Sequence, residues 1–251
     1  MPISFDLSGR CAIVTGANTG IGQGIALALA GAGADLVVVG HIAPDETIAA
    51  ISKLGRKVHF IEANLMSIEP IDRIVAEAAA TMGRIDILVN NAGIIRREDA
   101  TEFSEQDWDD VMNINVKTVF FMCQRVGRRM IAQGYGKIIN IASMLSFQGG
   151  IRVPSYTASK SGVAGITRLL ANEWALKGVT VNAIAPGYVA TDNTAQLRAD
   201  AERSKAILDR IPAGRWATPE DMGGAAVFLA SPASDYVNGH VLAVDGGWLA
   251  R

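Results

Sequence analysis

The sequence contains little cysteine, little net charge and no long hydrophobic run. Only Cys11 and Cys123 occur among its 251 residues, and they lie far apart, outside any ligand-spaced cluster. Neither a disulfide framework nor a metal site is therefore predicted. Lys and Arg number 23 against 25 Asp and Glu, a formal net charge of -2. A chain so nearly balanced has no field that attracts a polyanion, so no nucleic acid partner is expected.

The most apolar stretch, residues 24–40, is interrupted by Gly31, Gly33 and Asp35. It is too broken to cross a bilayer, so no membrane association is predicted. The first ten residues, MPISFDLSGR, lack the apolar run of a signal peptide. We therefore expect the protein in the cytoplasm.

Short β-branched runs alternate along the chain with longer helical patterns. The runs are apolar at consecutive positions, which is typical of parallel strands covered on both faces. We predict one domain over residues 1–251, a Rossmann-type α/β fold whose doubly wound parallel sheet carries helices on both faces. The expected strands are CAIV, LVVV, VHFI, IDILV, KIINIA, VTVNAI and HVLAV. The expected helices cover residues 22–32, 45–54, 68–82, 106–133, 155–177 and 219–230.

A glycine-rich segment joins the first predicted strand to the first helix. The missing side chains of Gly16, Gly20 and Gly22 permit a tight turn, let backbone approach a pyrophosphate and let the helix pack closely on the strand. This strand, turn and helix together predict a dinucleotide site. Its expected cofactor contacts in the turn are Gly16, Asn18, Thr19, Gly20, Ile21 and Gly22.

The second strand ends at Gly40 and His41, where the adenosine ribose would lie. An acidic residue there would bind both ribose hydroxyls, whereas an Arg would pair with a 2′-phosphate. The sequence offers neither. Because no Lys or Arg occupies this point or the glycine turn, NAD is predicted in preference to NADP.

Ser143, Tyr156 and Lys160 have the order of a hydride-transfer site. Ser143 follows the strand KIINIA, and the other two lie one turn apart on one face of the next helix. A hydride cannot leave an alcohol carbon unless the hydroxyl proton also leaves, and a nearby ammonium with the nicotinamide charge would lower the pKa of Tyr156 from about 10. We predict Tyr156 as acid/base, Ser143 as the group orienting the substrate oxygen, and Lys160 as holding the nicotinamide ribose.

The GxxxGxG turn, the NNAG segment at residues 90–93 and this catalytic set resemble the short-chain dehydrogenase/reductase family from Leu7 to Gly247. The resemblance implies a dinucleotide-binding part at about residues 7–140 and a catalytic and substrate part at about 141–251. The second part includes a mobile lid, residues 191–216, hereafter the lid segment.

The same resemblance assigns further residues of the site. Asn115 is implied as a fourth catalytic residue that helps anchor a water beside Lys160, with Asn113 as the alternative. Further cofactor contacts are implied at His41, Asn64, Leu65, Asn91, Ala92, Gly93, Tyr156, Lys160, Pro186, Gly187, Val189 and Thr191. Members of the family are usually tetramers, so a homotetramer is expected, with the helices at residues 106–133 and 155–177 in one interface.

Longer segments, among them NNAGIIRREDA, resemble family members that act on sugar acids. The implied reaction interconverts a keto group and a hydroxyl on a 3-deoxy sugar acid of bacterial pectin and uronate breakdown. Three alternatives stay open: a sister activity on gluconate, a 3-oxoacyl-carrier-protein reductase and a catalytically silent dinucleotide sensor. The reductase would normally present basic residues to NADPH, and an intact catalytic set argues against the sensor.

The loops after the fourth and fifth strands should border the reacting carbon. Arg97 in one loop and Arg152 in the other are candidates to bind a carboxylate bidentately. Alternatively, Arg96 and Arg97 beside Glu98 and Asp99 form a solvated ion-pair cluster. The full set of substrate candidates is Arg97, Ser143, Ser146, Gln148, Arg152 and Tyr156.

Overall fold

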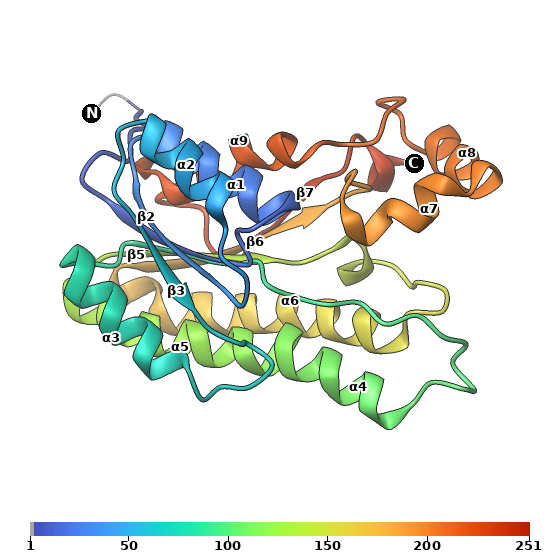
Figure 1. The fold of residues 1–251 in the computed structure, drawn as a ribbon, viewed down its shortest axis with the longest axis horizontal. Helices are drawn as coiled ribbons and strands as arrows, with labels where there is room; N and C mark the ends of the chain where they lie inside the picture. Colours follow the sequence, from blue (N-terminus) through green and yellow to red (C-terminus); the bar gives the residue numbers. More distant parts are fainter. Residues whose placement is uncertain (1–2) are drawn as a thin grey trace.

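Seven parallel strands form one sheet in residues 3–251, the part of the chain that the computed structural model describes (Figure 1). The strands lie in the order β3-β2-β1-β4-β5-β6-β7, so the chain winds outward from β1 in both directions. This arrangement confirms the predicted doubly wound α/β fold. The strands are β1 (Cys11–Thr15), β2 (Asp35–Gly40), β3 (Val58–Glu62), β4 (Ile87–Asn90), β5 (Gly136–Ile141), β6 (Val179–Pro186) and β7 (Val241–Val244).

Helices cover both faces of the sheet. Figure 1 shows α1, α2 and α9 on one face, α3, α4, α5 and α6 on the other, and α7 and α8 at one end. Their bounds are α1 (Gly20–Gly31), α2 (Asp45–Lys53), α3 (Ile71–Met82), α4 (Glu105–Met112), α5 (Thr118–Gln133), α6 (Pro154–Trp174), α7 (Ala195–Ala199), α8 (Ala201–Arg210) and α9 (Gly223–Ala230). Within residues 3–251, none of these helices has the length and apolar character that a membrane span requires.

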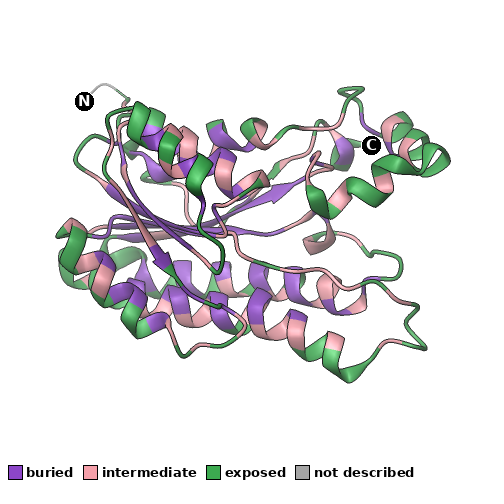
Figure 2. Cartoon of the chain, in the orientation of Figure 1, coloured by how far each residue is buried: buried purple, intermediate pink, exposed green. Residues whose placement is uncertain are grey.

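The core consists of two apolar clusters, one on each face of the sheet, and Figure 2 shows the buried strands between them. Neighbouring residues of one strand contribute to opposite clusters: Ile13 and Leu88 belong to one, Val14 and Val89 to the other. Successive side chains of a strand point to opposite faces, and both faces are covered here. This is why the strand sequences are apolar at every position instead of at every second one.

The structure departs from several predicted helices. The helices expected at residues 155–177 and 219–230 each have one end, residues 175–177 and 219–222, in a 3-10 turn. The helix expected at residues 106–133 is divided by a π-helical segment, Asn113–Lys117, between α4 and α5. The helix expected at residues 68–82 begins only at Ile71, directly after Pro70. Proline is compatible with a helix start but not with a helix interior, so the later start has a local cause.

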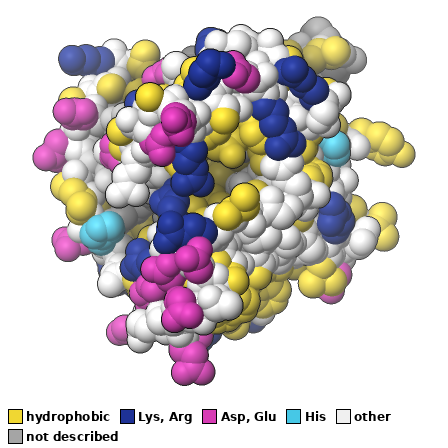
Figure 3. Space-filling model, turned by 90° about the vertical axis from the view of Figure 1, so that its right-hand side faces the viewer, with side chains coloured by type: hydrophobic (Ala, Val, Ile, Leu, Met, Phe, Trp, Pro, Cys, Tyr) yellow, Lys and Arg dark blue, Asp and Glu magenta, His cyan; other side chains and the backbone are white. Residues whose placement is uncertain are grey.

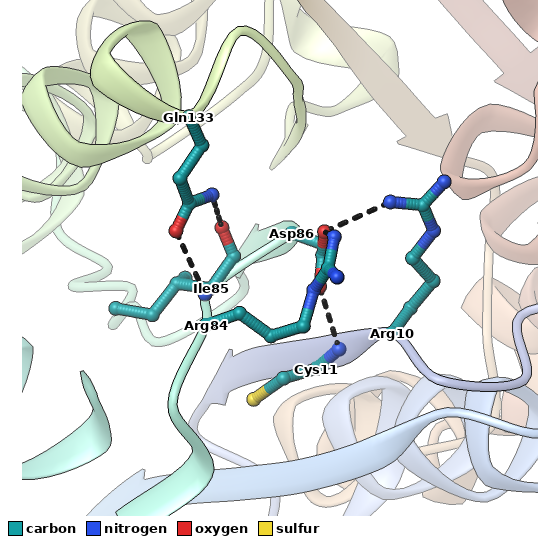
Figure 4. Close-up of polar contacts among 6 residues, drawn as sticks. All are labelled: Arg10, Cys11, Arg84, Ile85, Asp86 and Gln133. Atoms are coloured by element: carbon teal, nitrogen blue, oxygen red, sulfur yellow. Dashed lines mark hydrogen bonds and ion pairs between the residues drawn. The ribbon is translucent and has the colours of Figure 1, made fainter. Parts of the chain in front are cut away.

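A buried carboxylate binds several groups at the end of the sheet that lies opposite the phosphate turn (Figure 4). Asp86 is fully buried and accepts hydrogen bonds from Cys11 N at 3.0 Å, Arg10 Nη1 at 3.1 Å and Arg84 Nε at 2.6 Å. Beside it, the amide of Gln133 bonds both backbone groups of Ile85. These contacts join β1, the segment before β4 and the end of α5.

Asp86→Ala should lower the free energy of unfolding by about 1.5 to 3 kcal/mol, because it removes charged hydrogen bonds and leaves Cys11 N without an acceptor. Chemical denaturation of the two proteins measures the difference. The matched control is Asp209→Ala, which removes an exposed pair with Lys205 and should cost less than about 0.5 kcal/mol. Equal losses in the two variants would contradict a special role for Asp86.

Candidate active site

A cleft of about 540 Å³ opens at the carboxyl ends of the strands, the edge at which doubly wound sheets bind ligands. It brings together many residues that were predicted from distant parts of the chain. The predicted residues in its lining are Gly16, Asn18, Thr19, Gly20, Ile21, Gly22, His41, Asn64, Leu65, Asn91, Ala92, Gly93, Tyr156, Lys160 and Thr191.

Other residues of the lining were not predicted as contacts. They are Gly40, Ala63, Met66, Ile94, Ile114, Ile141, Asp192 and Asn193, most of them chain neighbours of predicted residues. Conversely, the lining does not include Pro186, Gly187 or Val189. Val189 is buried and forms a backbone bridge with Ala217, the residue that follows the lid segment.

The turn between β1 and α1 fits a pyrophosphate. Thr19 precedes α1 without capping it through its side chain, and the first turn of α1 holds no acidic residue. The first N–H groups of the helix are thus free to donate to an anion. A Cβ on Gly22 would lie 2.1 Å from the Gly16 carbonyl oxygen, so the close packing of helix on turn requires glycine there.

The NNAG segment ties this turn to the middle of the sheet. Asn91 N and Ala92 N both donate to Thr15 Oγ1 at 3.0 Å, and Asn91 Nδ2 donates to the Gly16 carbonyl at 2.9 Å. One residue earlier, Asn90 Nδ2 donates to Asn140 Oδ1 of the next strand at 2.9 Å. These contacts hold the turn against the middle of the sheet, and the segment also lines the cleft.

Tyr156 and Lys160 project from the first two turns of α6. Lys160 is buried, and its Nζ donates to the Ile141 carbonyl at 2.7 Å and lies 5.5 Å from the centre of the Tyr156 ring. Burial lowers the pKa of Lys160 to about 8. Ser143, at the end of β5, accepts a hydrogen bond from Leu145 N at 3.2 Å, which fixes its hydroxyl beside the start of α6.

Several groups around Tyr156 change the pKa of its hydroxyl in opposite directions. Burial raises the pKa of Tyr156 above its usual range, and the opposing influences are the Ser143 hydroxyl and the charge of Arg97. The charge of Arg97 therefore favours the phenolate. The Lys160 ammonium lies 5.5 Å from the ring centre and donates to a backbone carbonyl.

Asn115 lies in the π-helical segment and is almost fully buried. Its Nδ2 donates to the Ile94 carbonyl at 2.9 Å and to Ser159 Oγ at 3.2 Å, and its Oδ1 accepts from Ile94 N at 3.0 Å. The side chain therefore joins the loop after β4 to α6. π-helical turns are frequent at functional sites because they interrupt the regular backbone bonding of a helix.

The substrate candidates have different partners. Arg97 is exposed, and its Nη2 donates to the Asn193 carbonyl of the lid segment at 3.0 Å. Arg152 instead pairs with Glu98 at 3.0 Å and Asp99 at 3.1 Å, the two carboxylates that the ion-pair alternative assigned to Arg96 and Arg97. The Ser146 hydroxyl donates to the Lys160 carbonyl at 2.7 Å. Of the two arginines, Arg97 is the one with a side chain that no carboxylate engages among the described residues.

An anion-binding turn and a helix-borne Tyr and Lys that share one cleft define an oxidoreductase of the nicotinamide dinucleotide type. A family model described as Enoyl-(Acyl carrier protein) reductase matches residues 16–249. The chain belongs to the short-chain dehydrogenase/reductase family.

Within the family, the chain is similar to sugar-acid dehydrogenases. It is 65% identical, over 99% of this chain and 98% of the relative, to the 2-dehydro-3-deoxy-D-gluconate 5-dehydrogenase of Dickeya dadantii. The Bacillus subtilis protein of the same name is 56% identical over the same shares.

Solved structures of similar proteins hold a dinucleotide. A candidate 2-deoxy-d-gluconate 3-dehydrogenase from Agrobacterium tumefaciens with bound NADP has 59% identity and a TM-score of 0.90, covering 98% of this chain and 99% of that one. A gluconate 5-dehydrogenase from Burkholderia cenocepacia in complex with NADP and tartrate has 39% identity and a TM-score of 0.94, covering 98% of both chains.

Proposed function

We propose that the protein is a nicotinamide-dinucleotide-dependent dehydrogenase that oxidises the C5 hydroxyl of 2-dehydro-3-deoxy-D-gluconate, reversibly, in pectin and uronate breakdown. The observation that carries the proposal is that Tyr156 lines the same cleft as the phosphate turn. The acid/base group and the dinucleotide site therefore share one cavity. The names of the relatives that match the whole chain supply the substrate class.

In the oxidative direction, Tyr156 Oη accepts the proton of the C5 hydroxyl as the C5–O bond becomes a carbonyl. Bound NAD(P) would accept the hydride that leaves C5. Ser143 hydrogen-bonds the substrate oxygen and orients it. An ammonium has three donors, and Lys160 uses one of them on the Ile141 carbonyl, which leaves two for the nicotinamide ribose hydroxyls. Asn115 holds the loop after β4 against α6.

The activity is tested by incubating the purified protein with NAD and 2-dehydro-3-deoxy-D-gluconate, with D-gluconate in parallel, and following NADH absorbance. A 3-oxoacyl thioester with NADH or NADPH tests the reductase alternative. We expect the highest kcat/KM with the 3-deoxy acid. Faster turnover of gluconate would assign the sister activity, and turnover of the thioester alone would overturn the sugar-acid proposal.

NAD(H) is proposed as the preferred cofactor. Gly40 and His41 line the cleft at the end of β2, and Lys160, at its catalytic end, is the one Lys or Arg in that lining. A 2′-phosphate at Gly40 and His41 would therefore lack a guanidinium partner. Because several solved relatives hold NADP, the choice of cofactor is a question for experiment.

At neutral pH, kcat/KM should be higher with NAD(H) than with NADP(H), because no Lys or Arg lines the cleft beside Gly40 and His41 to pair with a 2′-phosphate. His41→Arg should raise kcat/KM with NADP(H) by adding that charge, whereas His41→Gln, the matched neutral variant, should not. Higher kcat/KM with NADP(H) in the unaltered protein would contradict the proposed preference.

We further propose a cytoplasmic homotetramer in which α5 and α6 form one interface, and a lid segment that closes over bound substrate. Leu169 on α6 is 49% exposed and Trp108 on α4 is 41% exposed, so the helix layer of this face presents apolar surface. The lid segment contains α7 and α8 and contacts the loop after β4 through Arg97 and Asn193.

A further inference from the structure

A second group of polar and aromatic side chains meets at the end of α8. The Arg210 guanidinium lies 4.0 Å over the Trp248 ring, and its Nη2 is 3.4 Å from Gln148 Oε1. Gln148 Oε1 also accepts from Trp248 Nε1 at 3.3 Å. The lid segment, the loop after β5 and the C-terminal segment are thus joined at one point.

This group consists of Gln148, Tyr188, Arg210, Trp216 and Trp248. Tyr188 packs between Trp216 and Trp248, with ring centres 5.5 and 4.8 Å away. It follows β6 directly, and Gln148 follows Ser143 in the loop after β5, so both belong to the carboxyl edge of the sheet. None of the five residues lines the cofactor cleft.

The charges of α8 are distributed unequally. Arg203 and Arg210 are seven residues apart in sequence, which places them on one helix face, and within residues 3–251 neither has a carboxylate at ion-pair distance. On the same helix, Lys205 pairs with Asp209 at 2.6 Å. Figure 3, which views the end of the molecule carrying α7 and α8, shows Lys and Arg side chains beside a hollow. Arg203 and Arg210 thus carry positive charge that no carboxylate of the described residues pairs with.

We propose that Arg210 is a second carboxylate-binding residue, which grips the acid group of the substrate from the lid side while Arg97 does so from the loop after β4. The inference rests on the proposed sugar-acid function. Stacking on Trp248 occupies the face of the guanidinium, and apart from the 3.4 Å contact of Nη2 with Gln148 the N–H groups at its edge can donate to a ligand. A carboxylate has lone pairs for two such partners.

Gln148 completes this subsite. Trp248 Nε1 donates to Gln148 Oε1, so this oxygen keeps a hydrogen bond when Arg210 binds a substrate instead of Gln148. The Gln148 amide N–H groups then remain for a substrate hydroxyl or keto oxygen. Recognition by a lid residue also couples substrate binding to closure, because the acid joins α8 to the loop opposite.

Arg210→Met should raise KM for 2-dehydro-3-deoxy-D-gluconate about 10-fold with little change in kcat, because the lost contact serves substrate and transition state alike. The carboxamide of the same compound should lose far less. Arg210→Lys should restore part of the affinity, since it returns the charge without the planar fork. Lys205→Met, on the same helix, is the matched control and should change neither constant.

Calorimetric titration of the acid and its carboxamide into the complex of the protein with NADH separates this proposal from the proposed function. Turnover tests the function, and binding tests the subsite without turnover. A loss confined to the acid in Arg210→Met supports the subsite whichever sugar acid is oxidised. Equal losses for both compounds would show that Arg210 only packs on Trp248, and unchanged binding of the acid would likewise overturn the proposal.

Discussion

Tyr156→Phe should lower kcat by at least about 10²- to 10⁴-fold, the usual contribution of general acid–base catalysis, while leaving the affinity for NADH nearly unchanged. The phenyl ring keeps the packing at the start of α6, and only the proton-transferring oxygen is lost. Steady-state kinetics and NADH fluorescence titration measure the two quantities. Turnover at the level of the unaltered protein would remove Tyr156 from its proposed role.

A matched control for this change is Tyr135→Phe. The Tyr135 hydroxyl is buried without a hydrogen-bond partner among the described residues, and its ring lies under Arg10 at the other end of the sheet. Removing that hydroxyl should leave kcat unchanged. A comparable fall in kcat for both variants would indicate a general structural effect instead of lost chemistry.

Arg97→Met should lower kcat/KM for the sugar acid by about 10- to 100-fold, because a charge-assisted hydrogen bond contributes about 1.5 to 3 kcal/mol. The carboxamide analogue should lose much less. Arg96→Met is the matched control: Arg96 pairs with Asp107 at 3.1 Å and Asp110 at 3.4 Å, so its charge is already used within the protein. Equal losses on acid and carboxamide would show that Arg97 does not bind the carboxylate.

The same variant has a second readout. The positive charge of Arg97 lowers the pKa of Tyr156, so its removal should raise that pKa. Oxidation needs the phenolate, and its rate rises with pH through the Tyr156 pKa. In Arg97→Met the rise of the oxidation rate with pH should therefore occur at higher pH, both for the sugar acid and for its carboxamide. The loss of affinity, in contrast, should be confined to the acid. An unchanged pH dependence of the oxidation rate would contradict the electrostatic effect of Arg97 on Tyr156.

The elements that patterning decides were predictable from the sequence. Strands apolar at consecutive positions indicated a sheet covered on both faces, and the turn at Gly16 and Gly22 could be identified because missing side chains leave a direct trace in the sequence. The positions of Tyr156 and Lys160 follow from their spacing on one helix. Both lie in the cleft with the turn.

Side-chain partners were harder to predict, because they depend on which groups the fold brings together. Arg152 has a φ of 60°, unusual for a residue with a side chain, and pairs with Glu98 and Asp99 from another loop. Lys160 directs its ammonium to the Ile141 carbonyl because β5 ends beside α6. The π-helical segment at Asn113–Lys117 has no distinct hydrophobic period, so a continuous helix was the simpler prediction.

The partners of Arg210 likewise could not be predicted from the sequence. Its partners, Gln148 and Trp248, are distant in sequence, and no local pattern connects a lid arginine with the C-terminal segment. Polar and charged surface residues have no periodicity that reveals whether they face solvent or a substrate. Only the folded arrangement separates Arg210, which has no ion-pair partner among the described residues, from Lys205, which has one.

Hydride transfer from C5 of the sugar acid is tested most directly with 2-dehydro-3-deoxy-D-gluconate that carries deuterium at C5. After incubation with NAD and the purified protein, mass spectrometry should find the deuterium on the nicotinamide of NADH and a new carbonyl at C5 of the product. Tyr156→Phe should transfer it at least about 10²-fold more slowly. NADH without the label, or deuterium released to water, would contradict the proposed chemistry.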